Sequence, residues 1–131
     1  MLDWTPIIQW FGFIPDFHDA EVISMDLRRA PELSTIRVDA WRTLSDVDER
    51  GYFKIDRRAV VCFVLGNVVR QEISDWNHQN VLNKLTVTTE QDGQVLSLET
   101  IYGVGGYFVA QEITVEVKPV SAPDTGTSLN G

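Results

Sequence analysis

The stretch from Ala59 to Leu65 limits the possible folds of this chain more than any other segment. All seven of its residues are apolar, and three of them are β-branched valines. An unbroken apolar run of this length and kind is typical of a β-strand that is buried on both faces. We therefore expect a β-sheet protein in which Ala59–Leu65 is a central strand.

Other segments alternate apolar and polar residues with the period of two that a half-buried strand requires. In the first of them, Ile23, Met25 and Leu27 share one face, which we predict to be the inward face. Neighbouring segments are joined by short turns, which favours antiparallel pairing. The predicted strands are residues 20–28, 34–43, 59–65, 68–73, 85–90, 94–99 and 107–118.

The last predicted strand is expected to stop at Pro119, because proline cannot donate a ladder hydrogen bond. Residues 120–131 have almost nothing to bury and are predicted to be a loose tail after a single globular domain of residues 1–119. The inward side chains of the last strand are predicted to be Tyr107, Val109, Ile113, Val115 and Val117.

Three segments containing glycine predict connections between these strands. Asp92-Gly93 separates two alternating segments and is a strong hairpin signal. Gly66-Asn67 predicts a second, two-residue hairpin turn. The run from Gly103 to Gly106 predicts a bend or a bulge before the last strand.

Two short helices complete the prediction. In the first, residues 4–11, Thr5 is the expected N-cap, Pro6 the first helical residue and Gly12 the stop. In the second, Ser74 or Asp75 caps a helix that reaches about Asn83. With about seven strands and no alternation of strand and helix, we expect an α+β, mainly β protein. Its antiparallel sheet is either curved with helices on one side or folded into a small sandwich.

The charge distribution narrows the possible partners. A net charge of -8 argues against nucleic acids and anionic membranes, because both attract positively charged proteins. Residues 1–27 contain five acidic residues and neither lysine nor arginine. The charge suits a basic partner, and the alternative is that it serves only solubility.

Cysteine usage and hydropathy bear on the cellular setting. Cys62 is the single cysteine, so neither an intrachain disulfide nor a zinc site of the usual cysteine-histidine kind is expected. The N-terminal residues have no basic, apolar signal pattern, and no segment has the roughly 20 apolar residues of a membrane span. These features predict a reducing, cytoplasmic setting.

The stretch from Phe17 to Glu21 carries the densest polar chemistry, placed directly before the first predicted strand. His18, Asp19 and Glu21 combine an imidazole with two carboxylates, and with His78 they would form a two-histidine, carboxylate metal site. In a second interpretation, His18 and Asp19 only hold the start of the strand through hydrogen bonds. In a third, they belong to a surface that binds a protein partner.

Aromatic residues supply the remaining candidates for binding. Trp76 lies in a polar segment with Asp75 and His78, which predicts an exposed loop where a tryptophan would act as an interface anchor. The candidate partner-binding residues are Phe17, His18, Asp19, Glu21, Asp75, Trp76 and His78. A dense N-terminal group is expected to plug one open end of the sheet, namely Trp4, Trp10, Phe11, Phe13 and Phe17.

Several of these features together resemble the Immunity protein 50 family. They are Gly12-Phe13, the stretch from Phe17 to Val22, the apolar central strand, and Tyr102-Gly103-x-Gly105-Gly106 before the last strand. The resemblance implies a small bacterial protein, not an enzyme and without a cofactor or metal, that neutralises a cognate toxin by stoichiometric binding. The alternatives are a metal-dependent enzyme or small-ligand binder that uses His18, Asp19, Glu21 and His78, and a structural or assembly subunit.

Overall fold

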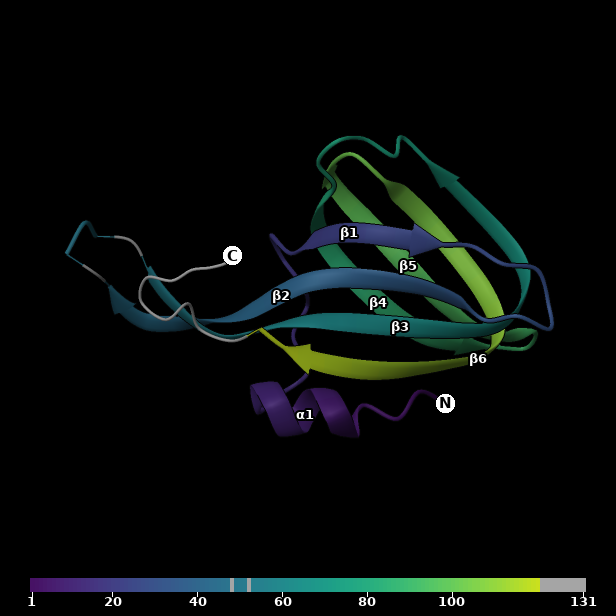
Figure 1. Ribbon diagram of the computed structural model, residues 1–131, viewed down its shortest axis with the longest axis horizontal. Coiled ribbons are helices and arrows are strands. Elements are labelled where there is room, and N and C mark those ends of the chain that lie inside the picture. Colours follow the sequence, from purple (N-terminus) through teal and green to yellow (C-terminus); the bar gives the residue numbers. More distant parts are fainter. Residues whose placement is uncertain (48, 52, 121–131) are drawn as a thin grey trace.

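The computed structural model describes residues 1–47, 49–51 and 53–120, in which six antiparallel strands close into a barrel beside one short helix (Figure 1). Around the barrel the strands follow the order β1-β2-β3-β6-β5-β4. The mainly β, antiparallel class is confirmed, whereas the described residues form neither a seventh strand nor a second helix. The elements are α1 (Thr5–Phe11), β1 (Glu21–Asp26), β2 (Ser34–Val47), β3 (Phe53–Ser74), β4 (Val81–Glu90), β5 (Gly93–Tyr102) and β6 (Gly105–Pro119).

Strand β3 combines two of the predicted strands, residues 59–65 and 68–73, which explains why the described residues form six strands and not seven. It runs for 22 residues between β2 and β6, so Ala59–Leu65 is central as predicted. The predicted turn at Gly66-Asn67 is wrong, because Gly66 and Val68 continue the pairing with β6. A two-residue turn of type I′ needs positive φ at both central residues, and here only Asn67 has one (56°). The strand continues through this point, and its register with β6 shifts only between Val68 and Arg70.

The inward face of β1 also differs from the prediction. The register with β2 shifts between Val22 and Ser24, which marks a bulge at Ile23. Val22 is buried, Ile23 is exposed, and Met25 turns back against the core. Leu27 lies beyond the strand and is exposed. The predicted inward face was therefore wrong for Ile23, because the extra residue of a bulge exchanges the two faces of a strand. It was wrong for Leu27 because the strand ends before that residue.

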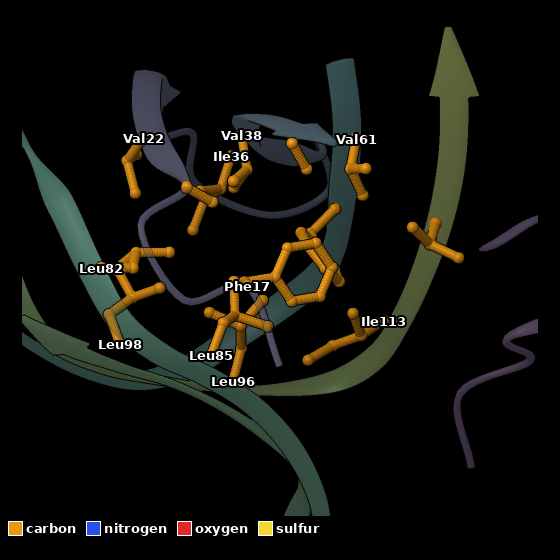
Figure 2. Packing of buried hydrophobic residues seen from close by; sticks show 14 of the residues in the cluster. Phe17, Val22, Ile36, Val38, Val61, Leu82, Leu85, Leu96, Leu98 and Ile113 are labelled. Carbon is orange, nitrogen blue, oxygen red and sulfur yellow. The ribbon is translucent and has the colours of Figure 1, made fainter. Parts of the chain in front are cut away.

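Buried aliphatic and aromatic side chains from every strand fill the barrel (Figure 2). In β6 the prediction holds for Ile113 and Val115, which are buried in this core. It is wrong for Tyr107, which is half-buried beside the core residue Phe108. Val109 is fully buried, although it lies outside the main core cluster, to which Ala110 belongs. The core residues labelled in Figure 2 are Phe17, Val22, Ile36, Val38, Val61, Leu82, Leu85, Leu96, Leu98 and Ile113.

Helix α1 packs along the part of β6 that β5 does not reach. Strand β5 pairs with residues 106–110 of β6, and the rest of β6 pairs with β3 alone. The helix lies beside β6 (Figure 1) and contacts β6 and β3. It buries Ile7 and Phe11. Of the five aromatic residues expected to plug an open end, Phe11 and Phe17 are buried in the core, Trp4 and Trp10 pack against it, and Phe13 is exposed.

The ends of α1 match the prediction only in part. Gly12 ends the helix with a φ of 88°, and its N–H donates to the carbonyl of Ile8 (2.8 Å). Thr5 is not the N-cap, because the helix already includes it. Instead the carboxylate of Asp3 accepts from both the backbone N–H (2.9 Å) and the hydroxyl (2.6 Å) of Thr5.

The predicted second helix is absent, and residues 75–80 form an irregular connection before β4. The buried side chain of Asn80 stabilises this connection. Its Oδ1 accepts from the N–H groups of Asn77 (3.0 Å) and Val104 (2.9 Å), and its Nδ2 donates to the carbonyl of Asn77 (2.9 Å). These bonds satisfy backbone groups that a helix would otherwise pair internally.

The other predicted connections agree with the structure. The turn before Gly93 joins β4 to β5 in a tight hairpin, in which Glu90 pairs with Gly93. A short glycine turn joins β5 to β6. Of the predicted tail, residues 121–131 lie outside the described part of the chain. No helix in the described ranges has the length and apolar character to span a bilayer.

Candidate functional site

The stretch from Phe17 to Glu21 closes the barrel between its first and fourth strands. Pairing of β1 with β4 is confined to Glu21 and Val81. Backbone hydrogen bonds extend the closure: the N–H of Asp19 donates to the carbonyl of Leu82, and the N–H of Leu82 donates to the carbonyl of Ala20, both at 2.8 Å. These backbone bonds hold the start of β1 in place.

Phe17 and Asp19 both have left-handed backbones, with φ of 66° and 68°. This conformation is uncommon for residues other than glycine, and it persists only where surrounding contacts enforce it. The Phe17 side chain supplies such contacts, because it is 3% exposed and lies edge-to-face on Phe63 at 5.9 Å. Figure 2 shows it inside the core. Phe17 thus supports the segment from within and is not available at the surface.

His18 and Asp19 point the other way, into solvent, with 54% and 61% of their side chains exposed. Nδ1 of His18 lies 3.1 Å from the carbonyl oxygen of Asn83, and Nε2 lies 3.6 Å from the Asp19 carboxylate. Because a carbonyl can only accept, Nδ1 carries a proton. The bond to Asn83, followed by the charge of Asp19, raises the pKa of His18 above its ordinary value of 6.5.

An NMR titration is expected to give His18 a pKa above 6.5. Asp19→Asn should lower this pKa without bringing it to 6.5, because the larger contribution, the bond to Asn83, remains. Since the folded pKa is raised, the stabilising contribution of protonated His18 is complete below the unfolded pKa. It is lost as the pH rises through the folded pKa. A His18 pKa at or below 6.5 would contradict the geometry.

A hollow of about 430 Å³ lies beside this segment, between residues 13–20 and residues 40–43 of β2. Phe13 and Ile14, each 48% exposed, and the half-buried Trp41 give it apolar walls. Asp16 and Asp19 add two carboxylates, and none of the lining residues in the described part of the chain is a lysine or an arginine. We call this site the motif hollow, after the sequence motif of residues 17–21 beside it. It combines apolar surface with negative charge, and it opens to solvent.

The cationic residue that adjoins the lining of the hollow in sequence is already paired with a carboxylate. Arg42 follows Trp41 on β2, and its guanidinium donates to both carboxylate oxygens of Asp56 (2.9 and 2.7 Å). Asp16 and Asp19 have weaker partners within the segment. Asp16 accepts from the backbone N–H of His18 (3.0 Å), and Asp19 faces the His18 ring.

The second group of candidates, in the connection 75–80, lies next to β1. The N–H of Val22 donates to the carbonyl of Asn80 (2.9 Å), which brings the connection to the same end of the barrel. Trp76 is 51% exposed, and Asp75 is exposed beside it. The His78 ring lies edge-on to the exposed ring of Tyr102 at 6.0 Å. This end of the barrel thus presents aromatic and acidic side chains from both groups.

The arrangement does not form the predicted alternative metal site. Among the described residues there is no group of three or more histidine, cysteine, aspartate or glutamate side chains that could hold a metal ion. His18 is bonded to Asn83, whereas Nδ1 of His78 lies 2.8 Å from the side-chain oxygen of Asn77. Glu21 lies opposite Asp39 on β2. The residues proposed as ligands are therefore engaged separately.

Sequence reasoning missed the walls of the hollow. Ile14 and Trp41 were not candidates, and Phe13 was assigned to the plug. The one available signal was that Trp41 falls on the polar face of its strand, beside Arg37 and Asp39. A large apolar residue on a polar face marks a surface with a possible partner.

The family model described as Immunity protein 50 matches residues 4–120. The chain belongs to the Immunity protein 50 family. The match extends from α1 through β6 and includes the whole of the barrel-closing segment, which confirms the resemblance seen in the sequence. Searches of curated proteins and of solved structures give no match. Membership in the Immunity protein 50 family implies a toxin as the partner in general terms.

Proposed function

We propose that this Immunity protein 50 member neutralises a cognate bacterial toxin by binding its toxin domain in a stoichiometric complex. The observation that carries the proposal is the family match over residues 4–120. The net charge of -8 favours a basic toxin, because opposite charges accelerate association. Protection of the producing cell would then take place in the cytoplasm, without a cofactor or metal.

We place the toxin-binding surface at the end of the barrel where β1 meets β4. The exposed side chains of His18 and Asp19 lie there, and Glu21 begins β1 beside them. Asp75, Trp76 and His78 extend the same end through the connection before β4. Exposed aromatic side chains supply most of the binding energy in many interfaces, and acidic side chains set the rate of encounter and the choice of partner.

Co-expression with the toxin encoded next to this chain tests the proposal. Cells that carry both genes are expected to survive, whereas cells that carry the toxin alone, or the toxin with an unrelated immunity protein, are expected to die. Death of the doubly expressing cells at normal levels of both proteins would refute the proposal.

A titration of the purified toxin distinguishes inhibition from catalysis. A stoichiometric inhibitor should lower toxin activity in proportion to its amount and abolish it at a fixed molar ratio. A chain that inactivated the toxin enzymatically would protect at a small fraction of that ratio. Light scattering on the mixture would then measure the mass of the complex.

A further inference from the structure

We infer that the motif hollow binds an arginine side chain of the partner protein. The inference rests on the proposed function and deepens it, because it names the group recognised and the place where it is held. The occupant follows from three properties of the hollow: its walls, its charge and its fixed backbone.

The walls suit a long side chain with an apolar stem. Phe13 and Ile14 are exposed on one side of the hollow, and Trp41 lies on the other. The hollow has a volume of about 430 Å³ and opens to solvent, so it offers room for one side chain. Arginine and lysine place their methylene groups against apolar surface while the charged head stays near polar groups.

The charge selects a cation for the head of that side chain. Asp16 and Asp19 line the hollow, no lysine or arginine lines it among the residues that the structure describes, and the adjacent Arg42 is held by Asp56. A guanidinium fits better than an ammonium, because its plane stacks on aromatic rings while its N–H groups reach carboxylates. The chain already contains one such pair, in which the Arg57 guanidinium lies 3.9 Å from the centre of the Trp10 ring.

The backbone of the hollow is held before any partner arrives. Phe17 is buried in the core, and the N–H of Asp19 is bonded to β4. The carbonyl of Asp16 accepts from the N–H of Leu85 (3.0 Å), which fixes the other side of the segment. Binding therefore orders few additional groups, and this lowers the entropic cost of the complex.

The experiment measures binding of a catalytically inactive form of the toxin encoded next to this chain. The double variant Asp16→Asn, Asp19→Asn and the single variant Trp41→Leu are compared with wild type. Each is expected to raise the dissociation constant about tenfold or more, as loss of a desolvated contact does. All three positions are outside the core, so each variant is expected to keep the fold. A urea midpoint close to that of wild type would verify this.

A matched control separates contact from long-range attraction. The control variant Glu90→Gln, Asp92→Asn also removes two negative charges. Both residues lie at the hairpin turn between β4 and β5, at the end of β4 away from residues 17–21. These carboxylates face the exposed Arg70 at 4.0 and 3.5 Å, so their loss should affect stability little. If both double variants weakened toxin binding equally, the carboxylates would act only through long-range electrostatic attraction. That result would overturn the inference.

Substitution of each surface arginine of the toxin with alanine identifies the occupant. One of them should weaken wild-type binding strongly and the Asp16→Asn, Asp19→Asn variant only slightly, because the two changes remove the same interaction. Additive effects for every arginine would overturn the inference. If the complex forms but all hollow variants bind normally, the inference fails and the proposed function stands. If the wild-type chain forms no complex, the proposed function itself fails.

Discussion

An alanine at position 17 is expected to lower the free energy of unfolding by about 3–5 kcal/mol, the usual cost of removing a buried phenylalanine side chain. Phe17 is 3% exposed and packs on Phe63, so its loss leaves a cavity in the barrel. It also removes the contact that holds the left-handed backbone of the barrel-closing segment. Urea denaturation measures the loss, which is large against a typical total stability of about 5–15 kcal/mol.

Phe13→Ala provides the matched control for this prediction. Phe13 is the same residue type four positions earlier, but it is 48% exposed on the motif hollow. Its removal should change stability by less than about 1 kcal/mol and should weaken toxin binding instead. If Phe17→Ala left stability unchanged and abolished binding alone, Phe17 would act at the surface, contrary to the structure.

Gly106→Ala is expected to destabilise the protein by about 3 kcal/mol or more. Gly106 has a φ of 131°, where other residues are strained, and a Cβ there would lie 2.0 Å from the carbonyl oxygen of Glu72 on β3. The obstacle is backbone in a paired strand, so the added methyl group must push β3 and β6 apart. Thermal and urea denaturation both measure this effect.

Gly51→Ala separates the two causes of that loss. Gly51 also has a positive φ, 85°, but a Cβ there would meet no atom of the described residues within 4 Å. Only the conformational strain then applies, and the expected loss is about 1 kcal/mol. Similar losses at the two positions would mean that the close approach of Gly106 to β3 is not important.

Local patterns predicted the parts of the fold that depend on local geometry. Ala59–Leu65 is central, and the hairpin at Asp92-Gly93 and the helix end at Gly12 are in place. These features follow from side-chain alternation and from backbone preferences of single residues. The errors occurred where distant contacts overrode those preferences. Gly66 and Asn67 lie in a strand that β6 keeps paired, and the bonds of Asn80 hold a connection that otherwise resembles the start of a helix.

The sequence locates the candidate residues along the chain but does not say how they lie in space. The sequence indicates that polar chemistry gathers between Phe17 and Glu21, and the structure adds that Phe17 points inward while His18 points outward. This division follows from the positive φ of Phe17, which no composition or periodicity reveals. The hollow was missed because its walls come from residues 13–20 and from β2, which are separate in the sequence.

By itself, the sequence determined the mainly β, antiparallel class, the central strand, the family and the position of the polar segment. Each of these depends on local alternation or on short motifs, which can be recognised without knowledge of the tertiary contacts. Only the tertiary structure decided that the sheet closes and that a hollow forms beside the closure. Both depend on contacts such as that of His18 with Asn83, 65 residues away, and such contacts exist only after the whole barrel has folded.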